Sequence, residues 1–126
     1  MSTGSSALPH SDVLHTRFCD LVGCRLPLVQ TGMGWVSGAN LTAATAAAGG
    51  LGILASITMT GEQFRDAVRR VQAETDRPFG VNLRAGQPDL AERIGWAAEQ
   101  GVRVFSFAGA PTKDAIARIH DAGALV

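Results

Sequence analysis

No charged side chain occurs between Arg25 and Glu62, and this long neutral stretch limits what the chain can fold into. It begins with an apolar run at 28–30, continues through closely spaced glycines, and becomes alanine-rich up to Gly49. A second apolar run follows at 52–55. Short apolar runs joined by a helix-forming segment are typical of a parallel sheet covered by helices. We therefore expect a buried strand, a glycine turn, a helix packed on all sides and a second buried strand.

The rest of the chain repeats this alternation of strand and helix. Thr60 and Gln63 have the spacing of a capping box, so a long helix is expected to begin there. The apolar residues of one face of this helix recur at spacings of three and four: Phe64, Ala67, Val68 and Val71. The other expected elements are helices at 16–22, from Ser37 or Gly38 to Ala48, from Pro88 to Gly101 and from Thr112 to Gly123, and strands at 79–83 and 102–107. The expected inward residues of the last two helices are Leu90, Ile94, Ala97, Ala98, Ile116 and Ile119.

Four strand-then-helix units predict the α/β class and, more narrowly, the N-terminal half of a TIM (β/α)8 barrel. A complete, small, open α/β sheet is the alternative. The apolar residues 124–126 read as the start of a fifth strand, which favours the partial barrel. We expect this partial domain to span residues 14–126. Residues 1–13 are rich in Ser, Gly, Pro and His and are expected to form a flexible tail.

Composition argues against several classes of partner. Lys and Arg total 11, as do Asp and Glu, so the net charge of zero favours neither nucleic acid nor an anionic membrane. Glycines 49, 50 and 52 and several polar residues interrupt the neutral stretch, which argues against a membrane span. Cys19 and Cys24 are interpreted as small buried thiols of a protein in the reducing cytoplasm.

Ligands of parallel α/β folds bind where the strands end at their carboxyl side. The residues expected there are 30–35, 56–58, Asn82, Arg84 and 108–110. Arg84 is the only ionisable residue among them, and this argues against a metal site or a hydrolase with paired carboxylates. Amides, hydroxyls and bare glycine backbone instead suit a flat, neutral heteroaromatic ring.

Purely structural interpretations of the same residues stay open. Gln30 could satisfy only backbone groups, and Asn82 could cap a turn. Met33 and Trp35 could belong to the core, and Arg84 could be a solvated charge. Glycines 32, 34 and 38 form G-x-G-x-x-x-G, one residue longer than the dinucleotide fingerprint, and residues 56–58 lack the acid that would hold a ribose.

Three segments, 27–34, 48–52 and 77–82, together resemble the nitronate monooxygenase family, also called 2-nitropropane dioxygenase-like. The resemblance extends over residues 16–126. This family uses FMN on a TIM barrel and includes FMN-containing enoyl-acyl-carrier-protein reductases and CoA-ester oxidoreductases of actinobacterial steroid-ring breakdown. The sequence of residues 30–36 is most similar to those of the last group.

The resemblance implies which residues contact the cofactor. The backbone around Met33 and Gly34 would lie against the isoalloxazine, and Asn82 would hydrogen-bond the ring or the ribityl chain. Gln30 would be a neighbour, so the implied FMN-binding residues are Gln30, Thr31, Gly32, Met33, Gly34 and Asn82. The family's catalytic His and phosphate-binding loops come from later strands, so no catalytic residue and no metal ligand is expected in this chain.

The expected function is therefore that of an FMN-dependent oxidoreductase of the nitronate monooxygenase type, present as its N-terminal half. Its substrate would be a small molecule, either a nitronate or a CoA or acyl thioester, and the protein could be a homo-oligomer. Two alternatives remain: a non-catalytic half-barrel that acts only through association, and a fragment of an FMN enoyl-thioester reductase. We expect neither nucleic acid nor a membrane as a partner.

Overall fold

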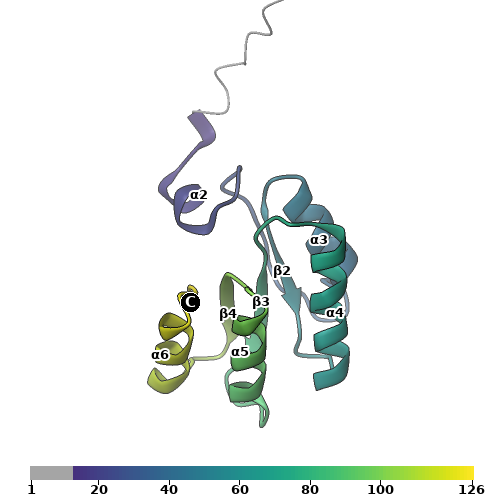
Figure 1. Cartoon of the computed structure of the whole chain (residues 1–126), viewed down its shortest axis with the longest axis vertical. Coiled ribbons are helices and arrows are strands. Elements are labelled where there is room, and N and C mark those ends of the chain that lie inside the picture. Colours follow the sequence, from purple (N-terminus) through teal and green to yellow (C-terminus); the bar gives the residue numbers. More distant parts are fainter. Residues whose placement is uncertain (1–12) are drawn as a thin grey trace, which may run out of the picture.

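The computed structural model describes residues 13–126 as an open parallel sheet with helices on one face (Figure 1). The four strands lie in chain order: β1 (Val29–Gln30), β2 (Leu51–Ala55), β3 (Gly80–Arg84) and β4 (Val104–Ala108). One helix follows each strand: α3 (Ala39–Ala47), α4 (Gly61–Glu74), α5 (Leu90–Glu99) and α6 (Lys113–Asp121). A short helix, α2 (Arg17–Val22), precedes β1. The expected tail falls almost entirely outside the described residues.

The two faces of the sheet have different neighbours. Val81, Leu83 and Phe105 point toward the helices and form the main core with apolar residues of α3 to α6. Because side chains alternate along a strand, Asn82 and Ser106 point to the opposite face. These two residues are partners in the β3–β4 register. Asn82 and Ser106 thus lie on the face that α3 to α6 do not cover, which we call the polar face, whereas Gln30 pairs with Gly52 on the side of α3.

Helix α2 lies apart from α3 to α6, toward the amino ends of the strands (Figure 1). Its residues Cys19 and Val22, with Cys24 just beyond, form a second core cluster with Leu51 and Ile53 of β2. Both cysteines are free and buried, which confirms the interpretation of small core thiols. The polar face of the sheet is therefore closed by apolar side chains at its amino end and stays open at its carboxyl end.

Helix α4 forms as the capping box predicted. Thr60 Oγ1 accepts a hydrogen bond from the Gln63 backbone, and the Thr60 backbone donates to Gln63 Oε1 at 2.9 Å. The four apolar residues expected to face inward, Phe64, Ala67, Val68 and Val71, are all buried. This cap fixes where the β2–α4 loop ends, and the loop borders the candidate site.

The lack of charge in α3 led us to expect a helix packed on all sides, and this prediction is wrong. Residues Ala39, Thr42, Ala43 and Ala46 are buried, whereas Asn40 and Leu41 on the other side are exposed. Alanine loses little when exposed, so a neutral alanine-rich sequence does not require burial all round. The buried face packs very closely on β2, since a Cβ on Gly52 would lie 2.3 Å from the Thr42 carbonyl oxygen.

Helix α5 also begins later than expected. Pro88 lies before the helix, whose N-cap residue is Asp89 and whose first residue is Leu90. The Asp89 carboxylate makes no capping bond because Arg93, one turn along, holds it instead. At the end of the chain, Leu125 forms an isolated parallel bridge with Val104, as expected for a segment that begins to extend the sheet. No helix within residues 13–126 has the length and hydropathy needed to cross a membrane.

Candidate functional site

The loop that follows β1 is organised around one hydroxyl group. Ser37 Oγ donates to the Thr31 carbonyl oxygen at 3.0 Å and accepts from the Met33 backbone N–H at 2.9 Å. It also accepts from Gln30 Nε2 at 3.0 Å, which uses its full capacity of one donor and two acceptor positions. Ser37 is 1% exposed, so these bonds hold the loop from within. From the sequence, Ser37 was expected only as a possible first residue of the helix that follows.

Gln30 is locked in one orientation by its neighbours. Besides Ser37, its Nε2 lies 2.6 Å from the Thr31 carbonyl oxygen and 3.1 Å from that of Ile53. A flipped amide would place oxygen against both carbonyls, so the assignment of nitrogen here is settled by its partners. Gln30 Oε1 is buried and has no hydrogen-bond partner among the described residues. A buried acceptor without a donor costs about 1–3 kcal/mol, and a ligand N–H could satisfy it.

Gly32 lies directly against Asn82. A Cβ atom at position 32 would stand 2.5 Å from the Asn82 Cβ and 3.0 Å from its Cγ. Any larger residue would therefore displace the amide or the loop. The absence of a side chain at position 32 brings the loop backbone onto the polar face of the sheet, across the end of β2.

Asn82 is fixed from both sides. Its side-chain Nδ2 donates to Ser106 Oγ at 2.9 Å, and its backbone carbonyl accepts from Ser56 Oγ at 2.7 Å and from the Ser56 N–H at 3.2 Å. Asn82 is only 8% exposed and does not cap a turn, so that structural interpretation is wrong. Ser106 was missed. The signal that could have indicated it is its place in the predicted strand, where it pairs with Asn82 in the parallel register.

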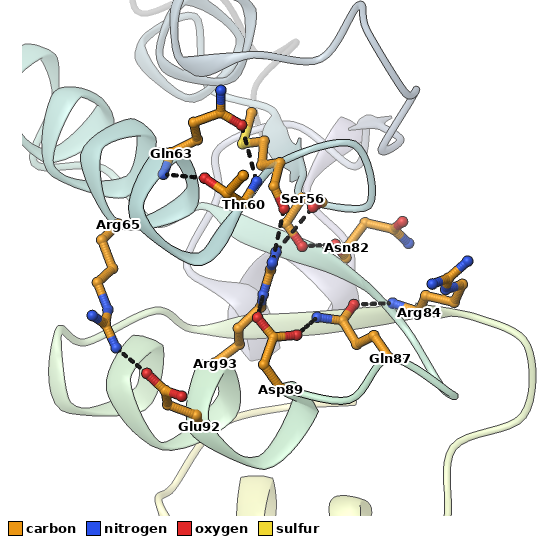
Figure 2. A network of polar contacts seen from close by, with 11 residues as sticks. Ser56, Thr60, Gln63, Arg65, Asn82, Arg84, Gln87, Asp89, Glu92 and Arg93 are labelled. Atoms are coloured by element: carbon orange, nitrogen blue, oxygen red, sulfur yellow. Dashed lines mark hydrogen bonds and ion pairs between the residues drawn. The ribbon is translucent and has the colours of Figure 1, made fainter.

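A buried arginine holds the adjoining loop. Arg93, on α5 and 8% exposed, donates to the Ser56 carbonyl oxygen at 3.0 Å and to that of Met59 at 2.8 Å. It also donates to Asp89 at 2.7 Å. Figure 2 shows this guanidinium between α5 and the β2–α4 loop, with Ser56 linking it to Asn82.

The expectation that Arg84 is the only ionisable residue near the strand ends is therefore wrong. Arg93 approaches the end of β2 from α5, and it was not among the residues of this helix that were expected to face inward. Arg84 itself is exposed, as expected for a solvated charge. The hydrogen bond from Arg93, with a second from Gln87, keeps the pKa of Asp89 below its usual value. The ion pair is thus charged at neutral pH and fixes the loop rather than exchanging a proton.

The structure brings together most of the residues that the sequence indicated. Gln30, Thr31 and Gly32 meet at the end of β1, and Gly32 contacts Asn82. Met33 and Gly34 are exposed at the tip of the same loop, so Met33 is not a core residue. Within residues 13–126 the backbone N–H groups of Gly32 and Gly34 have no hydrogen-bond acceptor. The loop therefore presents two free amide donors, of which that of Gly32 belongs to the residue in contact with Asn82.

Trp35 does not belong to the core either. It is 88% exposed and has φ 66°, the only non-glycine residue with positive φ in the described part of the chain. It follows Gly34 in a turn closed by the bond from the Val36 N–H to the Met33 carbonyl oxygen. The left-handed conformation costs a residue with a Cβ about 1–2 kcal/mol, so glycine is usual at such a turn position.

The donor set fits a flat, neutral ring. No group of three or more His, Cys, Asp or Glu residues able to hold a metal occurs within residues 13–126. The groups present are the orphaned Gln30 acceptor, the Asn82 amide and the free loop N–H groups, with the Gly32 backbone close to Asn82. Such groups can hydrogen-bond the nitrogen and oxygen edges of a heteroaromatic ring while the backbone lies close to its face.

Comparison with known proteins identifies the family. The nitronate monooxygenase family model matches residues 15–126. The chain belongs to this family. A relative from Mycobacterium tuberculosis, named (3aS,4S,5R,7aS)-5-hydroxy-7a-methyl-1-oxo-octahydro-1H-indene-4-carboxyl-CoA dehydrogenase, is 54% identical over 113 residues, which are 90% of this chain and 32% of the relative. A protein named nitronate monooxygenase from Pseudomonas aeruginosa is 42% identical over 83 residues, or 64% of this chain and 24% of that protein.

A solved structure supports the same fold. FabK from Thermotoga maritima superposes with a TM-score of 0.83 at 31% sequence identity, over 88% of this chain and 36% of that one. The chain thus spans about a third of the length of these relatives. Its four βα units form part of a TIM barrel, as the sequence predicted. The polar face with Asn82 and Ser106 is the face that lines the inside of such a barrel.

Proposed function

We propose that this chain supplies one wall of the FMN site of an oxidoreductase of the nitronate monooxygenase type. The observation that carries the proposal is the contact of Gly32 with Asn82, which places bare loop backbone beside a fixed amide at the open end of the polar face. Membership of the family and the orphaned Gln30 acceptor support the same assignment.

Each residue would have a distinct part in holding the cofactor. Gly32, Met33 and Gly34 would lie against the ring face, with Gly32 held directly against Asn82. Asn82 and Gln30 would orient its polar edge, and Thr31 would keep Gln30 in place through its carbonyl oxygen. Ser106 and Ser56 hold Asn82 from two sides, so the amide would need little reorganisation on binding.

The bound flavin would supply the redox chemistry by accepting an electron pair from the substrate. The role left to this chain is to bind, orient and exclude water. The side chains that gather around Asn82 are amides and hydroxyls, so the proton-transferring group would come from elsewhere in the functional protein.

A CoA thioester is the substrate class that we favour. The 54% identical relative is named as the dehydrogenase of a carboxyl-CoA compound, whereas the relative named nitronate monooxygenase is 42% identical over a shorter match. A nitronate is the second candidate. Both classes would meet the flavin at the same open end of the sheet.

The test has two parts. FMN titrated into the purified 126-residue chain should show saturable quenching of flavin fluorescence, and Asn82→Ala should weaken binding by about tenfold, the loss of one well-formed hydrogen bond. Gly95→Ala, which changes an exposed helix position with open space around it, is the matched control. If the wild-type chain is folded yet binds no FMN, a chimera that joins residues 13–126 to the remaining two thirds of the Mycobacterium tuberculosis relative decides. A folded chimera that lacks FMN would refute the proposal.

A further inference from the structure

Trp35 combines an exposed aromatic side chain with an unfavourable backbone conformation. It is a large aromatic residue that is 88% exposed, and its backbone is left-handed at φ 66°. The aromatic and cation–π contacts of the described residues involve Trp96 and Phe64, and none involves Trp35. A bulky, exposed residue held in an unfavourable conformation points to a function outside the fold itself.

Trp35 also forms one wall of a crevice of about 420 Å³. The crevice lies behind the β1–α3 loop, between the start of α3 and the first two turns of α4, with the end of β2 as its floor. The loop separates it from the polar face, because Gly32 of the same loop contacts Asn82 on that side. One short loop thus borders two different sites.

The wall opposite Trp35 is a hydrogen-bonding stripe on α4. Gln63, Asp66 and Arg70 line the crevice and share one helix face at spacings of three and four residues. Arg70 Nη2 donates to Asn40 Oδ1 at 2.9 Å, and Asp66 Oδ1 accepts a long bond of 3.3 Å from Arg69. One carboxylate oxygen of Asp66 and most of the Arg70 guanidinium remain available to a ligand. Apolar side chains of Ala39 and Met59 complete the lining.

We infer that this crevice binds the adenine ring of a CoA thioester, stacked on Trp35. An exposed tryptophan offers a flat π surface to a heteroaromatic ring. Asp66 can accept from an exocyclic amine, while Gln63 Nε2 and Arg70 can donate to ring nitrogens. The volume is ample for a purine. The inference rests on the proposed function, because it assigns to the crevice one end of the substrate whose other end would reach the flavin.

The location of the crevice fits a ligand with two ends. A CoA thioester carries its reactive acyl group at one end of a long flexible arm and its adenine at the other. The polar face and the crevice lie on either side of residues 32–38, so the arm would cross this loop. Ser37 hydrogen-bonds the backbone of Thr31 and Met33 and so fixes the part of the loop that lies between the two.

Tryptophan fluorescence tests the site directly. The chain has two tryptophans, so a Trp96→Phe variant reports on Trp35 alone. Coenzyme A and adenosine 5′-monophosphate should both quench this emission saturably, coenzyme A more tightly, whereas pantetheine, which lacks the adenine, should not. Quenching by pantetheine alone, or no saturable quenching by coenzyme A in the folded chain, would overturn the inference. Binding of the monophosphate as tight as that of coenzyme A would also overturn it, because the site would then serve free nucleotides.

Trp35→Gly separates a ligand role from a structural one. Glycine adopts positive φ without strain, so the variant should keep or raise the thermal midpoint of unfolding. Its affinity for coenzyme A, followed by calorimetry, should fall at least fivefold, the lower range of aromatic stacking on a base. A lower thermal midpoint with unchanged coenzyme A affinity would show that Trp35 is structural and would refute the inference.

A competition experiment between FMN and coenzyme A distinguishes the crevice from the proposed FMN site. FMN is itself aromatic, so it must be tested as a competitor. A chain or chimera loaded with FMN should still bind coenzyme A with an undiminished quench of Trp35. If FMN displaces coenzyme A from Trp35, the crevice inference fails while FMN binding stands. If coenzyme A binds but neither chain nor chimera takes FMN, the proposed function fails and the crevice remains.

Discussion

A Cβ atom on Gly32 would lie 2.5 Å from the Cβ of Asn82, which is closer than two unbonded carbon atoms can approach. The contact joins the end of β1 to the polar face of β3 and passes over the strand between them. Both the shape of the loop and the position of the amide therefore depend on the absence of one methyl group.

Gly32→Ala should accordingly destabilise the fold. Overpacking of this kind typically costs about 1–3 kcal/mol, and urea denaturation would measure it. Gly95→Ala is the matched control, because position 95 is an exposed site inside α5 with no atom near the new Cβ. The control should be stabilised by up to about 1 kcal/mol. Equal effects of the two changes would contradict the close approach at Gly32.

Arg93→Met should be the most damaging single charge change in this part of the protein. It removes the donors to the carbonyl oxygens of Ser56 and Met59 and leaves Asp89 without its partner. Leaving a buried acceptor without its donor costs about 1–3 kcal/mol, so we expect a loss of that size from the two carbonyl oxygens. Arg118→Met removes an exposed pair with Asp114 and should change stability by less than about 0.5 kcal/mol. If both variants unfold at the same urea concentration, Arg93 does not hold the loop.

The Arg93–Asp89 pair also predicts how stability depends on pH. Because Arg93 lowers the pKa of folded Asp89, the carboxylate stabilises the fold fully at pH values above its unfolded pKa of about 4. This contribution is lost as the pH falls through the lowered folded pKa. The stability difference between wild type and Asp89→Asn should thus be constant from pH 7 to about pH 5 and shrink below about pH 4. A difference that grows on acidification would contradict the assigned direction.

The pattern of strands and helices was predictable, but the polar contacts across elements were not. The capping box of Thr60 and the buried face of α4 are local signals, and both were confirmed. Arg93 could not be recognised, because its partners Ser56 and Met59 lie more than thirty residues earlier and meet it only after α5 packs on α4. The all-round burial expected of α3 was wrong for a related reason, since composition says which residues tolerate burial and not which faces find a neighbour.

The last prediction concerns the hydroxyl group at the centre of the β1–α3 loop. Ser37→Ala removes the acceptor of the Met33 N–H and of Gln30 Nε2 and the donor to Thr31. The Met33 amide should then exchange with solvent at least about tenfold faster, the equivalent of one lost hydrogen bond. Hydrogen exchange followed by NMR would show this at one residue. Ser106→Ala, which removes the partner of Asn82 and leaves these loop bonds intact, should not change the Met33 rate. Unchanged protection in Ser37→Ala would mean that the turn at 33–36 maintains the loop without the hydroxyl.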